Sequence, residues 1–425
     1  MNKMQEVHMK RAGESYYEMR HPSGLRIFVF PKPESHSTYA IFGTSYGSID
    51  NVFRRSDEKD VTRVPAGIAH YLEHKMFENE DGVDTFVRYA KTGANANAYT
   101  SFDKTCYLFS CSDNFYDSLE ILLDFVQKPY FTDQTVQKEQ GIIGQEIQMY
   151  EDDPTWQVLF NMLGGMYHNH PVKLNIAGSE QSIAEITPEL LYQCYHTFYN
   201  LNNMALCVAG NADPEKVLEV CDKMLQPSED VRVERIFEPE PDSILKPCIH
   251  KKGSVASPLF YLGFKENASR RATAEETVQT EILLEALAGD SSPLYRRLLD
   301  AGLINESSFG GDYLEGPGYA CVTFSGESKD PDKVAEEIRK EVDSVRRNGL
   351  NPELFEDAKR TIYGSIISGF NSPENIANSM IAACFAGRSI APDADAAADA
   401  TSEDILARLQ KQLLPQNAVL SVVEP

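Results

Sequence analysis

Short runs of apolar residues alternate with amphipathic segments along the first half of the chain. Residues 24–32, 39–48 and 204–211 are compact apolar runs bounded by polar or turn residues, which predicts strands. Residues 113–130 and 135–151 instead repeat apolar positions every three or four residues, which predicts helices. The first half therefore mixes strands with helices.

The second half shows the same alternation. Apolar runs at residues 259–265, 320–327 and 418–423 predict strands, and residues 274–289 and 331–349 have helical periodicity. Two α/β halves of about equal size are implied, although no sequence repeat is detected between them.

A break in this pattern separates the halves. Residues 226–247 are rich in proline and charge and have no clear periodicity, which predicts a linker. A length of 425 residues with 42% hydrophobic content allows two or more domains with sizeable cores. We expect a first domain at 1–228, a linker at 229–246 and a second domain at 247–425.

The stretch GIAHYLEHKMF, residues 67–77, contains a candidate metal site. Pro65 suits the first turn of a helix, and on a helix His70, Glu73 and His74 share one face. Two imidazoles one turn apart can bind one zinc ion, with the glutamate beside a bound water as a general base. The alternative is a polar surface helix with two incidental histidines.

A zinc site needs a third protein ligand, and the predicted helix within residues 135–154 supplies candidates. Glu139 and Glu146 are seven residues apart and share a face. Carboxylates that face a core need a partner, which favours a buried cation, and Gly141 and Gly144 would allow close packing. An amphipathic helix with two solvated glutamates remains the alternative.

The motif HYLEH at 70–74, followed by Glu146, resembles the inverzincin motif of the pitrilysin and mitochondrial processing peptidase family. Residues 93–110 resemble the family's substrate-binding edge strand, and residues 167–217 resemble the end of its first domain. The likeness covers most of residues 20–220 and weakens afterwards. In length the chain is similar to bacterial half-size subunits.

This resemblance implies the fold class. It is α+β, built of α/β layers, with two structurally related domains that face each other. Each domain is expected to be a mainly antiparallel sheet backed by helices.

The resemblance also implies a role for each residue of the motif. His70, His74 and Glu146 would be the zinc ligands, Glu73 the base, and Glu139 a residue behind the ligands that orients one of them. The implied activity is that of a zinc metalloendopeptidase. Zinc would polarise the scissile carbonyl, and Glu73 would pass a proton from water to the leaving amine.

Peptide binding is expected at the strand NANAYT, residues 95–100. Ala96, Asn97, Ala98 and Tyr99 would border a peptide that adds to an exposed sheet edge through its backbone. Only an extended or unfolded segment has a free backbone, so peptides are the expected substrates.

One departure from the family pattern affects the expected assembly. The family's substrate-clamping arginine and tyrosine align onto Leu298 and Asn305, and the nearby Arg296 and Arg297 could replace only the arginine. Either the activity is impaired or another subunit provides these groups. We expect a dimer, and specifically a heterodimer with a homologous subunit that lacks zinc but carries the clamp. A non-catalytic scaffold or assembly subunit is the alternative function, against which the intact HxxEH motif argues.

Charge and composition limit the other possibilities. A net charge of −24 argues against nucleic-acid binding, which requires a basic surface. No apolar run is long enough to span a membrane and the N-terminus lacks a signal-peptide core, so we expect a cytoplasmic protein. The eight cysteines form no CxxC motif and are expected to be reduced.

Overall fold

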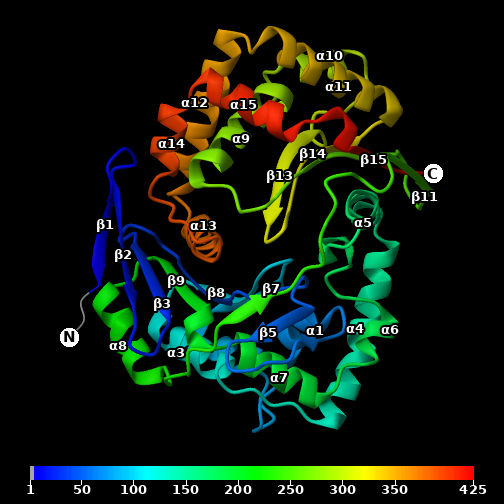
Figure 1. Cartoon of the computed structure of the whole chain (residues 1–425). Helices are drawn as coiled ribbons and strands as arrows, with labels where there is room; N and C mark the ends of the chain where they lie inside the picture. Colours follow the sequence, from blue (N-terminus) through cyan, green and yellow to red (C-terminus); the bar gives the residue numbers. More distant parts are fainter. Residues whose placement is uncertain (1–3) are drawn as a thin grey trace. The chain divides into compact units, whose positions relative to one another are not determined.

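The chain forms two compact units in the computed structural model, which describes residues 4–425 (Figure 1). Each unit is assembled from three separate segments. Unit 1 contains residues 4–147, Asn175–Ile236 and Ser368–Ala391. Unit 2 contains Gln148–Leu174, Phe237–Ile367 and Pro392–Pro425. The segment predicted as a linker, 229–246, is therefore divided between them.

Unit 1 is organised around a seven-stranded sheet in the order β1-β2-β3-β9-β4-β8-β7. Its strands are β1 (Gln5–Met9), β2 (Glu14–Arg20), β3 (Arg26–Pro31), β4 (Thr38–Thr44), β7 (Asn95–Thr100), β8 (Thr105–Cys111) and β9 (Met204–Gly210). Only β3 and β9 are parallel, and the other neighbours are antiparallel. Because β7 pairs only with β8, it is an edge strand.

A small second sheet in unit 1 includes part of the predicted linker. It consists of β5 (Val52–Arg55), β6 (Thr62–Arg63) and β10 (Val233–Arg235), in the order β10-β5-β6. The β10 residue Arg235 is anchored by Asp50, whose Oδ1 lies 2.5 Å from its Nε. This part of the linker is thus attached to unit 1.

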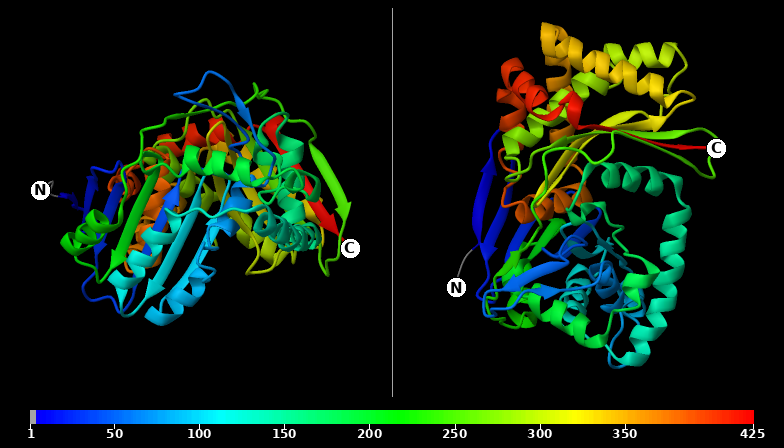
Figure 2. Two further views of the ribbon diagram at one scale, coloured as in Figure 1. Left: turned by 90° about the horizontal axis from the view of Figure 1, so that it is seen from below. Right: turned by 45° about the vertical axis from the view of Figure 1, so that its right-hand side comes forward.

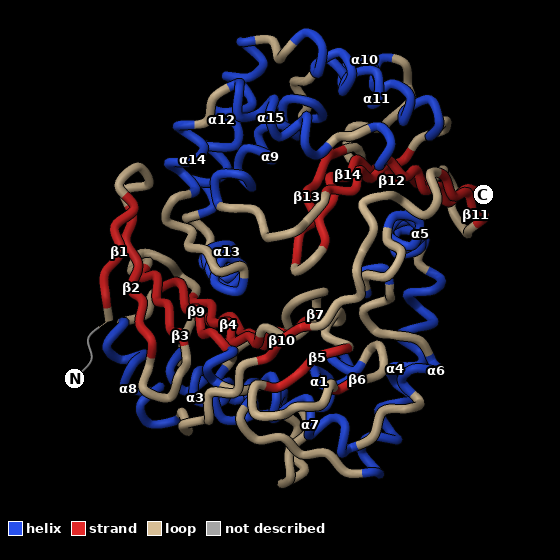
Figure 3. Tube along the Cα trace, in the orientation of Figure 1, coloured by secondary structure: helices blue, strands red, loops and turns tan. Residues whose placement is uncertain are grey.

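Unit 2 has a five-stranded sheet in the order β11-β15-β12-β14-β13 (Figure 3). Its strands are β11 (Cys248–Lys252), β12 (Leu259–Glu266), β13 (Gly310–Gly316), β14 (Tyr319–Glu327) and β15 (Ala418–Glu424). The β11–β15 pair is parallel, and the remaining pairs are antiparallel.

The two sheets share one topology. The order β3-β9-β4-β8-β7 in unit 1 corresponds strand for strand to β11-β15-β12-β14-β13 in unit 2, with the single parallel pair in the same place. The predicted α+β class, with structurally related domains of mainly antiparallel sheet backed by helices, is confirmed.

Helices cover both faces of the unit 1 sheet (Figure 1). The α-helices that lie within unit 1, or begin in it and continue past its boundary as α4 does, are α1 (Ile68–Lys75), α2 (Thr85–Thr92), α3 (Phe115–Val126), α4 (Asp133–Asp152), α6 (Glu180–Ile183), α7 (Pro188–Phe198), α8 (Pro214–Met224) and α13 (Pro373–Phe385). A 3₁₀ turn, η2 (Leu201–Asn203), precedes β9.

In unit 2 most helices gather on one face of the sheet, and a continuous apolar core lies between them and the strands. The α-helices are α5 (Pro154–Met166), α9 (Ala274–Ala288), α10 (Pro293–Asp300), α11 (Pro331–Asn348), α12 (Pro352–Gly369), α14 (Asp393–Asp399) and α15 (Ser402–Gln412). The 3₁₀ turns are η1 (Pro171–Lys173) and η3 (Pro415–Asn417).

Each unit takes one helix from the other half of the sequence. Helix α5 follows α4 in the chain but packs on β12 and β15, and α13 follows α12 but packs on β4 and β9 (Figure 2). Both helices begin at a capping residue followed by proline, Asp153-Pro154 and Ser372-Pro373. Proline disfavours helical backbone in the residue before it, so the preceding long helix stops and the chain changes direction.

Glycines at equivalent positions of the two sheets receive these exchanged helices. A Cβ on Gly43 of β4 would lie 2.7 Å from Cδ1 of Ile381, a residue of α13. A Cβ on Gly263 of β12 would lie 2.4 Å from Sδ of Met162, a residue of α5. Each glycine pairs with the second residue of a neighbouring strand, Ala205 of β9 or Val419 of β15. A methyl group at either place would therefore have to displace a side chain of the packed helix.

No helix among residues 4–425 is long and apolar enough to cross a lipid bilayer. All eight cysteines are free, and seven of them are buried.

We predict that Gly43→Ala reduces the free energy of unfolding by about 2 kcal/mol, because overpacking against Ile381 forces α13 outward. Ile381→Val removes the clashing Cδ1 methyl, so the double variant should recover about 1 kcal/mol relative to the sum of the single changes. Urea unfolding monitored by circular dichroism gives the free energies of unfolding of the original chain, the two single variants and the double variant.

Gly310→Ala is the matched control, because no atom lies within 4 Å of the place that a Cβ on this strand glycine would occupy. We expect it to change stability by less than about 1 kcal/mol. Additive effects of Gly43→Ala and Ile381→Val would contradict the proposed contact.

Candidate metal centre

Helix α1 carries three of the predicted site residues and is almost entirely buried. Seven of its eight residues are buried, among them His70 at 6% and Glu73 at 8% exposure. A polar surface helix with incidental histidines is therefore excluded. The helix begins at Ile68 rather than near Pro65, because Gly67 adopts a left-handed φ of 90° that ends the helical path upstream.

The start of α1 is held by a close backbone junction. A Cβ on Gly67 would lie 2.3 Å from the carbonyl oxygen of Ala177, and a Cβ on Gly178 would lie 2.5 Å from that of Ala66. The hydroxyl of Ser182 also donates to the Ala66 carbonyl, at 2.8 Å. These contacts fix where α1 begins and hence how its side chains are directed.

Helix α4 approaches α1 from the side of the predicted carboxylates. The Tyr71 hydroxyl of α1 donates a hydrogen bond to the Val136 carbonyl of α4. Beyond this contact, the side chains of Glu139 and Glu146, which are two turns apart on α4, both lie next to the ring of His74. The two glutamates therefore share a face that is directed at a partner on α1 rather than at solvent.

The side chains of His70, His74 and Glu146 converge. Nε2 of His70 lies 3.5 Å from Oε1 of Glu146, and Nε2 of His74 lies 3.2 Å from Oε2. One ligand atom from each residue falls within 4.8 Å of the others. Ligands at zinc-bond lengths in tetrahedral geometry are about 3.3–3.6 Å apart, so this donor set fits one zinc ion with a further position open.

His74 is enclosed by carboxylates on both sides of its ring. Its Nδ1 donates to Oε1 of Glu139 at 3.0 Å while Nε2 faces Glu146. Burial lowers the pKa of His74, but the hydrogen bonds with these two glutamates outweigh it and raise the pKa to about 10. A positive charge is therefore favoured between His74 and Glu146, as a proton or as a metal ion.

Glu73 lies beside this group with a partner that the sequence did not predict. Burial raises the pKa of Glu73, opposed by His70 and by a hydrogen bond from the Thr100 hydroxyl to Oε2 at 2.5 Å. Thr100 is the last residue of β7. A signal was present, because Thr100 shares a strand face with Ala96 and Ala98, but no spacing rule connects it to Glu73.

Strand β7 spans the predicted residues 95–100 and presents a free edge. The Ala98 N–H donates to the side-chain Oδ1 of Asn97 at 2.9 Å and thus not to β8. Ala96 lies on the same side by strand alternation. Tyr99 has its hydroxyl directed to Asn378 of α13, at 3.4 Å, so its ring is used within unit 1.

A cavity of about 670 Å³ connects the centre to the edge strand. Its lining includes Glu73, His74, Glu139, Asn97 and Ala98. The rings of its other lining residues Phe77 and Phe86 stack at 4.7 Å and form an aromatic wall. The predicted base, ligand and strand residues therefore border one space.

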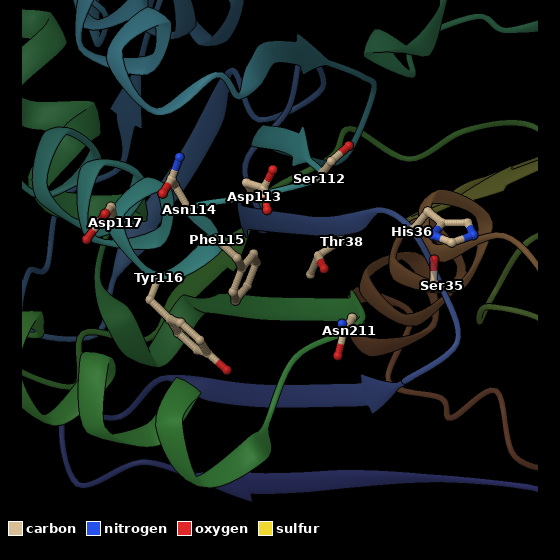
Figure 4. Close-up of a pocket in the computed structure, with 10 residues that line it drawn as sticks. All are labelled: Ser35, His36, Thr38, Ser112, Asp113, Asn114, Phe115, Tyr116, Asp117 and Asn211. Atoms are coloured by element: carbon tan, nitrogen blue, oxygen red, sulfur yellow. The ribbon is translucent and has the colours of Figure 1, made fainter.

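Another pocket, of about 320 Å³, lies near the beginning of α3 (Figure 4). Its polar lining contains none of the predicted site residues. The chemistry concentrated at α1 and α4 is absent there.

Two sequence expectations are corrected or clarified by the structure. Gly141 and Gly144 make no close contact with another element, because open space surrounds the Cβ position of each; the buried apolar residues of α4 are Val136, Ile143 and Ile147. The two positions onto which the family's clamping arginine and tyrosine align both have contacts within unit 2. Leu298 is a fully buried core residue of α10. The side-chain amide of Asn305 donates a hydrogen bond to Oε2 of Glu327 at 2.9 Å.

Comparison with known families matches most of the chain. The family model described as "Insulinase (Peptidase family M16)" matches residues 58–180, and the one described as "Peptidase M16 inactive domain" matches residues 185–362. The first of these ranges contains His70, Glu73, His74 and Glu146.

Relatives of the same length agree with these matches. The uncharacterized zinc protease YmfH of Bacillus subtilis is 37% identical over 99% of both chains. YmxG of the same organism, also named an uncharacterized zinc protease, is 25% identical over 72% of this chain and 75% of its own.

Solved structures show the same fold. A protein from Alicyclobacillus acidocaldarius, described as a putative M16-like peptidase, has a TM-score of 0.93 and 34% identity, covering 100% of this chain and 99% of its own. Pitrilysin has a TM-score of 0.76 and 15% identity, with all of this chain covering 47% of its length.

We predict that Gly67→Ala destabilises unit 1 by more than about 3 kcal/mol, because the methyl group meets a backbone oxygen and the backbone has a positive φ. Gly82→Ala is the control, since Gly82 has φ 72° but nothing within 4 Å, and should cost about 1 kcal/mol. Thermal and urea unfolding of both variants measure the difference. Equal losses would show that the junction with Ala177 does not constrain α1.

Proposed function

Because the chain belongs to the M16 family of peptidases, we propose that it is a zinc-dependent endopeptidase that cleaves extended or unfolded peptides. The observation that carries the proposal is the convergence of His70, His74 and Glu146 beside Glu73. Two imidazoles and a carboxylate form a donor set suited to zinc, and a glutamate next to them suits a general base.

The residues of the centre have distinct parts in this proposal. His70, His74 and Glu146 would hold the zinc ion, which supplies a Lewis acid and makes water more acidic when bound. Glu73 takes the proton of the attacking water and delivers it to the leaving amine. Its buried position raises its pKa and so strengthens it as a base.

Two further residues position these groups. Glu139 accepts from Nδ1 of His74, which fixes the ring so that Nε2 faces Glu146. Thr100 donates to one oxygen of Glu73 and leaves the other oxygen for the proton transfer. This bond also links the base directly to the strand proposed to bind substrate.

The substrate would add to the sheet beside β7. Ala96 and Ala98 offer backbone groups at the free edge, and Asn97 and Ala98 border the cavity that contains Glu73. A peptide paired with this edge would bring a backbone carbonyl toward Glu73 and the metal ligands. Folded proteins lack a free backbone and would bind poorly.

We propose that the active species is a heterodimer with a homologous subunit that lacks zinc. Leu298 belongs to the apolar core and Asn305 bonds within its own unit, so neither replaces the clamping arginine or tyrosine. The nearby Arg297 is paired with Glu341 at 2.5 Å. The clamp would come from the partner.

The alternative, a non-catalytic scaffold with a peptidase fold, makes a different prediction about Glu73. A scaffold has no need for a buried carboxylate in the position of a base, since burial of an unneeded carboxylate is unfavourable. Substituting this residue would leave a scaffold's function unchanged.

We predict that Glu73→Gln retains one equivalent of zinc and loses peptide cleavage by about a thousandfold or more, since the amide cannot accept the proton. His74→Ala should lose most of the metal as well as the activity. Zinc content by atomic absorption and cleavage of a peptide mixture by mass spectrometry test both variants.

The control is Glu151→Gln, which changes an exposed carboxylate near the end of the helix that carries Glu146 and should keep both zinc and activity. Full zinc in His74→Ala would place the metal elsewhere. Full activity in Glu73→Gln would show that Glu73 is not the general base.

We predict that Ala98→Pro raises KM for peptides by about tenfold while zinc content is unchanged, because proline removes an N–H at the free edge without breaking the ladder to β8. Ala98→Ser keeps the N–H and is the control. Steady-state kinetics separate the two. The edge-strand proposal fails if both variants behave like the original chain.

We predict that co-expression with a homologous subunit that lacks HxxEH but carries the arginine and tyrosine raises cleavage by about tenfold or more over this chain alone. Changing that subunit's tyrosine to phenylalanine should abolish the gain. Equal rates for the single chain and the mixture would show that this chain needs no external clamp.

A further inference from the structure

A second group of metal-ligand side chains lies in unit 2. Among the described residues, Cys248, His250 and Asp332 place one ligand atom each within 4.8 Å of the others. All three belong to unit 2, so this group is separate from the centre on α1 and α4. It plays no part in the proposed peptidase chemistry.

The strand β11 directs two of these side chains to one face. Cys248 and His250 are two residues apart on a strand, so their side chains point to the same side of the sheet. Ile249 between them points to the other side, where its Cδ1 lies 2.7 Å from the place that a Cβ on Gly165 of α5 would occupy. The face that carries the cysteine and histidine is therefore the one opposite α5.

Helix α11 supplies the third side chain on that face. Asp332 lies in its first turn, just after the capping residue Asp330. Oδ1 of Asp332 is 3.8 Å from Nε2 of His250, which is too long for a hydrogen bond. The two groups approach each other and leave a gap between them, as ligands of a common ion do.

We propose that Cys248, His250 and Asp332 form a peripheral zinc-binding site, with water completing the coordination. A thiolate, an imidazole and a carboxylate are a donor set that zinc accepts. Tetrahedral zinc separates nitrogen and oxygen ligands by about 3.3–3.6 Å, so the observed separation needs only a small side-chain adjustment. The exposed position of all three residues gives an ion direct access.

The chemical setting of the cysteine agrees with this assignment. Cys248 is the one exposed cysteine of the eight, and the other seven are buried. Its sulfur is therefore open to an ion from solution, on the face that also carries His250 and Asp332. A bound ion would tie the edge strand β11 to the beginning of α11.

Cobalt substitution tests the site in the full chain. Co²⁺ bound to a thiolate gives an intense near-ultraviolet charge-transfer absorption, which the histidine and glutamate ligands on α1 and α4 cannot give. Titration of metal-free protein should produce this absorption and saturate at two equivalents of cobalt in total, one for this site and one for the centre on α1 and α4, or at one equivalent in His74→Ala. Zn²⁺ should displace it, because zinc binds such ligands more tightly than cobalt.

Variants identify the ligands. Cys248→Ser should abolish the absorption, and His250→Ala and Asp332→Asn should each weaken cobalt binding by about tenfold or more. Lys252→Ala, on the same strand face but without a ligand, should leave it unchanged. His74→Ala should also keep it, which separates this site from the peptidase centre.

Thiol modification gives an independent readout that does not need the variants to fold. Zinc should slow the reaction of Cys248 with a disulfide reagent by about tenfold, and a chelator should restore the rate, because a metal-bound sulfur is a poor nucleophile. Absence of the cobalt absorption at saturation, its survival in Cys248→Ser, or a modification rate that zinc does not change would each overturn the proposal.

Discussion

The fold depends on a packing constraint, namely that an apolar sheet face has to be covered, and here the cover comes from the other half of the sequence. Helix α5 packs on β12 and β15 of unit 2, and α13 packs on β4 and β9 of unit 1. At about 25 cal/mol per Å² of apolar surface, losing such a helix would cost several kcal/mol, a large part of the stability of a domain. Neither sheet can therefore be covered by its own half of the chain alone, and the sheet that supports the candidate metal centre of unit 1 requires residues 373–385.

Much of this could be predicted from local patterns. The runs expected as strands at 24–32, 39–48 and 204–211 are β3, β4 and β9, because buried central strands are almost continuously apolar. The exchange of α5 and α13 could not be predicted in this way. The prolines at 154 and 373 indicate where one helix ends and the next begins, but not which sheet the next helix covers. The equivalence of Gly43 and Gly263 appears only once both sheets are superposed strand by strand.

The site shows the same division between local and long-range information. Helical spacing placed His70, Glu73 and His74 on one face, and Glu139 and Glu146 on another helix, from sequence alone. Their convergence depends on how α1 and α4 pack, which the hydrogen bond from Tyr71 to Val136 helps to fix. The contact of Thr100 with Glu73 and the Cys248 group could not be predicted, because a hydroxyl on a strand face or a C-x-H pair on a strand is too common to indicate a role.

The glycine junction at the start of α1 has a consequence for protein engineering. Because the backbones of residues 66–67 and 177–178 touch with no room for a Cβ, the HxxEH helix and the loop before α6 form one interlocked piece. A graft of residues 67–77 into another scaffold would carry the candidate ligands of α1 but not the backbone contacts that set their direction. A transplant of the centre has to include the segment from Ala177 to Ser182, even though none of its side chains comes from the motif.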